Sequence, residues 1–70
     1  MRPLPAKKII KILLQHGFVL SRQKGSHVIF RHQQTGTIIP IPLHGKNKPL
    51  PIGTFLNIIS QSKISKENFK

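Results

Sequence analysis

The segment Ile-Pro-Ile-Pro-Leu, which ends at Leu43, carries two prolines two residues apart, Pro40 and Pro42. Alternating apolar residues predict a β-strand over residues 37–43. The residues on one face of this strand are Ile39, Ile41 and Leu43. Proline has no N–H group, so prolines at this spacing withhold their donors from the same neighbouring strand. A central strand cannot accept that loss. We therefore expect an edge strand whose proline side is unpaired.

Amphipathic patterns predict one helix before and one after the strands. The apolar residues at helical spacing are Ala6, Ile9, Ile10, Leu13 and Leu14 in the first helix, and Ile52, Phe55, Leu56 and Ile59 in the second. Gly17 suits the left-handed position that follows a helix, so the first helix should end just before it. The second helix should run from Ile52 to about Gln61. Ser65 is expected to cap a last short turn that ends at Phe69.

Residues 18–24 and 26–32 are predicted to form two antiparallel strands joined by a turn at Lys24 and Gly25. If those two residues are the whole loop, Arg22 pairs with His27. The same register places Leu20 opposite Ile29, and it puts Phe18, Leu20 and Ile29 on the core face, with Arg22 and His27 near its rim. A slip of one residue would move His27 to the other face. A second turn over residues 33–36 leads into the edge strand.

The predicted order is helix, three antiparallel strands, helix, which is an α+β fold with both helices on one face of the sheet. This is the layout of double-stranded-RNA-binding domains, although layout alone does not define function. We expect residues 1–70 to form a single domain. A chain this short buries roughly 60% of its unfolded surface, so its core is thin. Phe18 and Phe55 are expected in that core, whereas Phe30 is left open as a stacking platform for bases.

Charge limits the partners of this chain. The sequence has twelve lysines and arginines but one acidic residue, Glu67, so its formal net charge is +11. Such a chain attracts polyanions: nucleic acid first, an acidic protein second and an anionic membrane surface third. No run approaches the ~20 apolar residues of a membrane span, and no targeting signal is visible. We therefore expect a cytoplasmic protein.

The scarcity of metal ligands narrows the possible chemistry. Magnesium-dependent nucleases hold their ions with clustered carboxylates, which one glutamate cannot supply. The chain has no cysteine, and its four histidines lack ligand spacing on one helix face. We predict neither a metal site nor a cofactor.

The segment Gln-Lys-Gly-Ser-His, which ends at His27, is the strongest candidate for chemistry. Imidazole titrates near neutral pH and can take the proton of a ribose 2′-hydroxyl, and the neighbouring Arg22 and Lys24 can offset charge on the phosphate. A surface histidine in a basic strand is the alternative interpretation. His16 is expected to be structural at a helix C-terminus, and His32 to be solvated at a strand end.

Four segments together form a recognisable pattern: residues 22–32, Ile-Pro-Ile-Pro-Leu-His-Gly at 39–45, Gly-Thr-Phe-Leu at 53–56, and the helix end Leu-Gln-His-Gly-Phe at 14–18. In these segments, and over nearly its whole length, the chain resembles the HicA family of bacterial toxin ribonucleases. Membership implies a double-stranded-RNA-binding-type fold and ribosome-independent cleavage of messenger RNA. It also implies that His27 is the catalytic residue and that an acidic HicB-type antitoxin covers the active site.

On this interpretation Arg22 and Lys24 hold the phosphate, and Ser26 orients the turn or hydrogen-bonds the substrate. Further residues considered for RNA contact are Lys46 and Lys48, with Gly25 and His44 as possible secondary site residues. The rival hypothesis is a non-catalytic RNA-binding module of the same fold, such as a ribosome-associated protein or an inactive toxin. A third is a protein whose main task is to bind an acidic partner.

Overall fold

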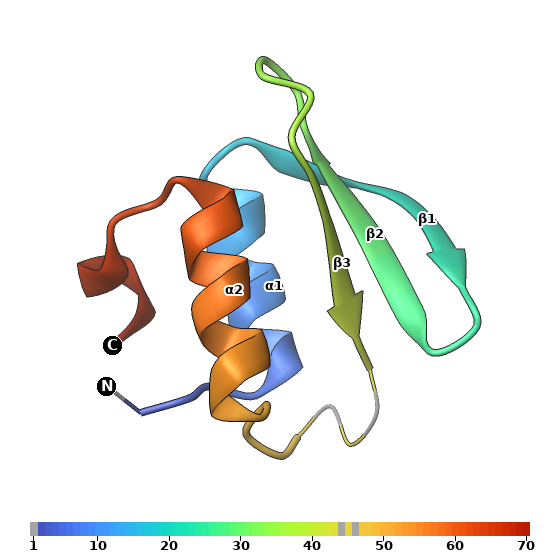
Figure 1. The fold of residues 1–70 in the computed structure, drawn as a ribbon. Coiled ribbons are helices and arrows are strands. Elements are labelled where there is room, and N and C mark those ends of the chain that lie inside the picture. The colour runs from blue at the N-terminus through green and yellow to red at the C-terminus, as the bar shows by residue number, and fades with distance from the viewer. Residues whose placement is uncertain (1, 44, 46) are drawn as a thin grey trace.

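The computed structural model describes residues 2–43, 45 and 47–70. Its elements are α1 (Ala6–Gln15), β1 (Phe18–Lys24), β2 (His27–His32), β3 (Ile38–Pro42), α2 (Ile52–Ser62) and the short 3-10 helix η1 (Lys66–Phe69). Figure 1 shows this α-β-β-β-α order, with the sheet on one side and both helices on the other. The predicted α+β fold is confirmed. None of the helices in the described part of the chain is long and apolar enough to span a membrane.

The three strands form an antiparallel sheet in the order β1-β2-β3, so β3 is an edge strand as its prolines predicted. Pro42 lies opposite His27 and Pro40 opposite Ile29. The amide of Leu43 donates to the carbonyl of Ser26 at 2.6 Å, next to the Pro42 pair. Hydrogen-bonded and non-bonded pairs alternate along an antiparallel ladder, so both prolines fall at non-bonded pairs, where no N–H is required.

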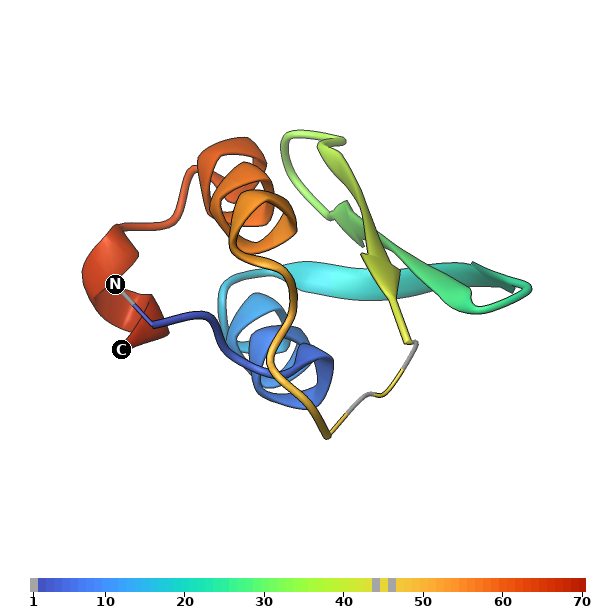
Figure 2. The same cartoon turned by 60° about the horizontal axis from the view of Figure 1, so that its bottom comes forward.

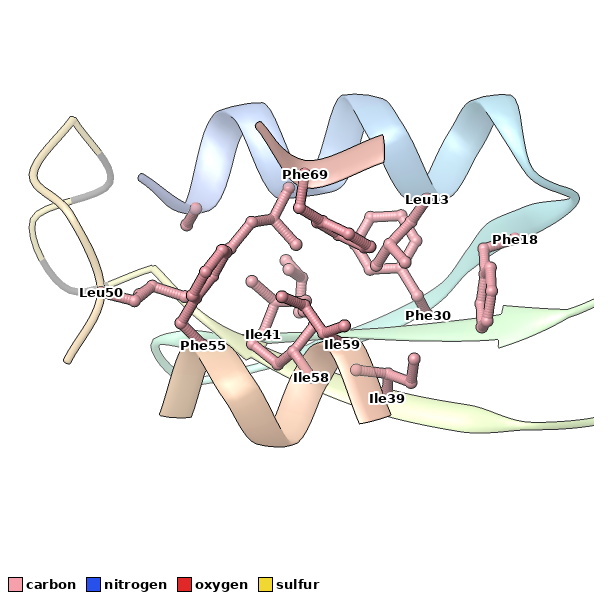
Figure 3. Packing of buried hydrophobic residues seen from close by; sticks show 13 residues of the cluster. Leu13, Phe18, Phe30, Ile39, Ile41, Leu50, Phe55, Ile58, Ile59 and Phe69 are labelled. Carbon is pink, nitrogen blue, oxygen red and sulfur yellow. The ribbon is translucent and has the colours of Figure 1, made fainter. Parts of the chain in front are cut away.

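The core lies between the helices and the inner face of the sheet (Figure 3), and all four phenylalanines belong to it. Phe18 and Phe55 are buried, as predicted. Phe30 is also buried, so its suggested use as a stacking platform for bases is wrong. Phe69 meets Phe55 edge-to-face at 6.2 Å and fastens η1 to α2. Ser65 caps η1, because its side chain accepts from the Glu67 amide, as predicted.

The buried residues of both helices differ in part from the predicted apolar stripes. In α1 the stripe is largely as expected, but Leu14 is 52% exposed. In α2, Ile58 takes a core position, whereas Ile52 and Leu56 are 49% and 45% exposed. Apolar residues surround much of α2, so periodicity alone allows more than one buried face. Packing of α2 beside β3, visible in Figure 2, selects the face that includes Ile58.

The β1–β2 hairpin differs from its predicted register. Lys24 pairs with His27, so the turn is Gly25-Ser26 and not Lys24-Gly25. The predicted pairing of Arg22 with His27 is therefore wrong. The core face is also different: Val28 and Phe30 are buried on β2, while Leu20 is 56% exposed and Ile29 only half-buried. The buried residues of β2 are thus the alternate set to the predicted one, so His27 lies on the face away from the helices.

Candidate functional site

The turn that presents His27 depends on Gly25. Gly25 has φ +60° and Ser26 does not have positive φ, which is the pattern of a type II′ hairpin turn. A two-residue turn of this type matches the twist of the strands and places Lys24 directly opposite His27. The Gln23 side chain donates to the Gly25 carbonyl at 3.3 Å. His27 thus begins β2 immediately after a tight turn.

A β-bulge in β1 changes the face to which the side chains of this strand point. Leu20 pairs with Phe30 and Arg22 pairs with Ile29, so Ser21 is the extra residue. Side chains alternate along a strand. Without the bulge, Arg22 would therefore lie on the same face as Leu20, which is the core face because Leu20 pairs with Phe30. The inserted residue reverses that alternation, so Arg22 and the residues after it face the opposite way.

The result is a basic outer face on the sheet, opposite the helices. Cross-strand partners point to the same face, so the β2 residues of this face bring their partners with them. Its members are Val19, Arg22 and Lys24 on β1, His27, Ile29 and Arg31 on β2, and Ile38, Pro40 and Pro42 on β3. Arg22, Lys24 and His27 are all exposed. Arg22, Lys24 and His27, which the sequence predicted as site residues, thus lie on one face, although through a register other than the predicted one.

A groove runs along the β3 side of this face, between the edge strand and α2. The residues that line it are His27, Pro40, Pro42, Leu50, Pro51, Thr54, Asn57, Ile58 and Gln61. Sequence reasoning did not predict the α2 residues of the groove. The signal that was available is their spacing: Thr54, Asn57 and Gln61 are three and four residues apart, which places them on one face of the helix.

His32, at the other end of β2, has a ring that is hydrogen-bonded on both nitrogens. Backbone amides of Gln34 and Thr35 donate to Nδ1 of His32 at 3.1 and 3.3 Å. The proton therefore sits on Nε2, which donates to the carbonyl of His16 at 3.0 Å. The ring also meets Phe18 edge-to-face at 4.9 Å. His32 is thus a structural residue, and the expectation that it is solvated is wrong.

His16 is structural as well. Its Nδ1 donates to the Ile12 carbonyl, four residues earlier, at 2.8 Å. Every hydrogen bond that the described residues make to a histidine ring belongs to His16 or His32. Among the described histidines, His27 is the one whose ring is free to meet a ligand.

The remaining predicted site residues are placed as follows. Ser26 is exposed in the hairpin turn, and its carbonyl accepts from Leu43. Lys48 is exposed on the loop before α2, where its amide donates to the Gly45 carbonyl at 2.7 Å. Lys46 and His44 lie outside the described residues. Within residues 2–43, 45 and 47–70, no group of three or more His, Cys, Asp or Glu side chains is placed to hold a metal ion.

Fold and site together define a small α+β protein whose outer sheet face combines cations with one free histidine. A model of the family described as "HicA toxin of bacterial toxin-antitoxin" matches residues 6–64, which covers both main helices and the whole sheet. The chain belongs to the HicA toxin family. A search of curated proteins returned no match. Membership supports a role as the toxin of a toxin–antitoxin pair and a nuclease role, and it implies an antitoxin partner and an RNA substrate.

Proposed function

We propose that this chain is an endoribonuclease that cleaves messenger RNA without a metal ion, with His27 as its general acid or base. One observation carries the proposal: among the described histidines, His27 alone has a free ring, and it stands among the cations of the outer face. His16 and His32 support the fold through both backbone and ring contacts.

The chemistry follows from the neighbours of His27. Its imidazole accepts the proton of a ribose 2′-hydroxyl, and the oxygen attacks the adjacent phosphorus. Lys24, its cross-strand partner, and Arg22, two residues earlier on the same face, hold the phosphate and offset the charge that develops on its oxygens. The O2′–P bond forms as the P–O5′ bond breaks. The leaving 5′-oxygen takes a proton from solvent water, His27 releases its proton to solvent, and the upstream RNA fragment ends in a 2′,3′-cyclic phosphate.

Metal independence is supported by where the carboxylate lies. Glu67, the one acidic side chain in the sequence, belongs to η1. Figure 1 shows η1 on the helix side, away from the β1–β2 turn that precedes His27. A Mg²⁺ ion requires oxygen ligands, and the outer face offers it cations instead.

A cleavage assay tests this proposal. Purified wild type and His27→Ala are incubated with the same RNA, and with DNA of the same sequence, with and without EDTA. We expect wild type to cut RNA only, to tolerate EDTA, and to leave a 2′,3′-cyclic phosphate and a 5′-hydroxyl. Equal cleavage by His27→Ala would show that His27 is not catalytic. Loss of cleavage in EDTA would contradict the metal-free mechanism.

We further propose that an acidic antitoxin of the HicB type covers the outer face. The support is charge: no acidic residue lies on that face, which presents Arg22, Lys24 and Arg31. Mixing the purified chain with such an antitoxin should abolish cleavage, and the substitutions Arg22→Glu and Lys24→Glu should weaken the complex. An unchanged affinity in both variants would place the antitoxin elsewhere.

A further inference from the structure

We propose that the groove between β3 and α2 binds one unpaired RNA base next to the bond that His27 attacks, and that Asn57 and Gln61 select which base it accepts. This rests on the proposed function and deepens it, because it assigns substrate choice to residues outside the basic outer face. His27 belongs to both surfaces, so a base held in the groove lies beside the reacting ribose.

The lining of the groove suits a base and does not suit a phosphate. Among the described residues that line the groove, His27 is the only one with an ionisable side chain; the others are apolar or carry uncharged amides and a hydroxyl. A phosphate is held by cations, and these lie on the β1 side of His27, at Arg22 and Lys24. The two sides of His27 therefore offer different chemistry, one for the phosphate and one for a neutral ring.

One wall of the groove can read the edge of a base. Thr54, Asn57 and Gln61 lie on one face of α2, and the side chains of Asn57 and Gln61 are exposed. A side-chain amide offers a carbonyl acceptor and two N–H donors, which match the mixed donors and acceptors of base edges.

The opposite wall offers flat apolar contact. Pro40 and Pro42 stand on β3 at the non-bonded pairs with Ile29 and His27, so their rings lie beside the catalytic histidine. Leu50 and Ile58 continue this lining and are buried in the core, which keeps the walls in place. A base that enters between the prolines and α2 gains apolar contact on its ring while its edge faces the amides.

The ligand class follows from this arrangement. A base in a duplex is stacked and paired, and side chains read RNA sequence mainly in single-stranded segments, where bases can be turned outward. The groove therefore takes an unpaired base. The prolines that make β3 an edge strand thus have a second use as a wall of the binding site.

A sequencing assay tests the assignment. A pool of randomised single-stranded RNA is cut by wild type, Asn57→Ala, Gln61→Ala and the control Gln15→Ala, and the new 5′-hydroxyl ends are sequenced. Gln15 is a suitable control because it is an exposed amide at the end of α1. Wild type and the control should favour one base beside the cut by roughly 5- to 100-fold, as expected for a bidentate contact. The Asn57 or Gln61 variant should reduce that preference to below about threefold. An unchanged preference in both variants overturns the proposal.

A binding measurement separates this proposal from the proposed function. The inactive His27→Ala chain is titrated with each of the four homopolymeric RNA trinucleotides, and the side-chain amide resonances of Asn57 and Gln61 are followed by NMR. One base should shift these resonances more than the others. Equal shifts for all four, or none, would overturn the base pocket even if wild type cleaves RNA. If wild type does not cleave RNA, a base-dependent shift would still support the pocket while the ribonuclease assignment fails.

Discussion

The two ends of β2 each carry a histidine, and the two side chains have opposite surroundings. His27 follows the β1–β2 turn, is exposed, and shares its face with Lys24 and Arg22. His32 ends the strand, where Nδ1 accepts from two backbone amides and Nε2 donates to the end of α1. Residue type and strand are the same, so only the neighbours distinguish a candidate catalyst from a structural support.

This difference shows how one residue type can have opposite surroundings five positions apart in the sequence. The bonds to His32 require a neutral ring with its proton on Nε2, and they join the β2–β3 turn to α1. A general base must exchange protons with its substrate, so a ring committed in this way is unsuited to catalysis. His27 has the freedom that His32 lacks.

The largest expected effect separates the two histidines by activity. His27→Ala should lower the rate of RNA cleavage by about 10²–10⁴-fold, the usual contribution of a positioned general base. Its free energy of unfolding should change by no more than about 0.5 kcal/mol, as is usual for an exposed site. Cleavage rates and urea denaturation measure the two quantities. A large loss of stability in this variant would break the comparison.

The second effect is on stability and lies at the other end of β2. His32→Ala should lower the free energy of unfolding by about 1–3 kcal/mol, because three hydrogen bonds and the contact with Phe18 are lost. His32→Asn should lose less, since its side-chain oxygen can still accept from the Gln34 and Thr35 amides. Urea denaturation of both variants checks this order. If the folded His32→Asn protein cleaves RNA far more slowly than wild type, His32 is more than structural.

The third effect concerns RNA affinity around His27. Affinity for single-stranded RNA should fall steeply with salt, with a slope equivalent to about 3–6 phosphate contacts. The double substitution Arg22→Ala and Lys24→Ala should weaken binding roughly tenfold and reduce that slope by about 1–2. Lys63 lies just beyond the end of α2, and Lys66 lies in η1. The matched double substitution of these two lysines by alanine should change the RNA affinity and the salt slope far less. Fluorescence titrations at several salt concentrations measure the slopes. Equal losses in the two double variants would refute phosphate binding centred on His27.

The finest comparison is between the glycines near the two histidines. Gly25→Ala should cost about 1–2 kcal/mol, because φ is +60° and a Cβ there meets no other atom within 4 Å. Gly17→Ala should cost more, since φ is +89° and its Cβ would lie 2.9 Å from Nε2 of His32. Thermal or urea unfolding measures the loss in the free energy of unfolding for each variant. The difference between the two losses reports how tightly His32 is packed. Equal losses would show that His32 moves aside freely.

The sequence by itself determined the order of the elements and the edge position of β3, and it indicated His27 as the candidate for chemistry. These depend on local rules: apolar periodicity sets helix or strand, prolines at spacing two exclude a central strand, and the excess of cations sets the class of partner. The segment around His27, with its similarity to HicA toxins, also identified the family that the match over residues 6–64 confirmed.

Tertiary structure alone decided which residues meet. A bulge at Ser21 has no sequence rule as simple as an edge proline, yet it allows Phe18 to face the core while Arg22 and Lys24 share the face of His27. The rotation of α2 is set by its contact with β3, and that rotation brings Asn57 and Gln61 to the groove. Periodicity identifies an amphipathic element, but register and rotation are chosen by the energy of packing against residues distant in the chain.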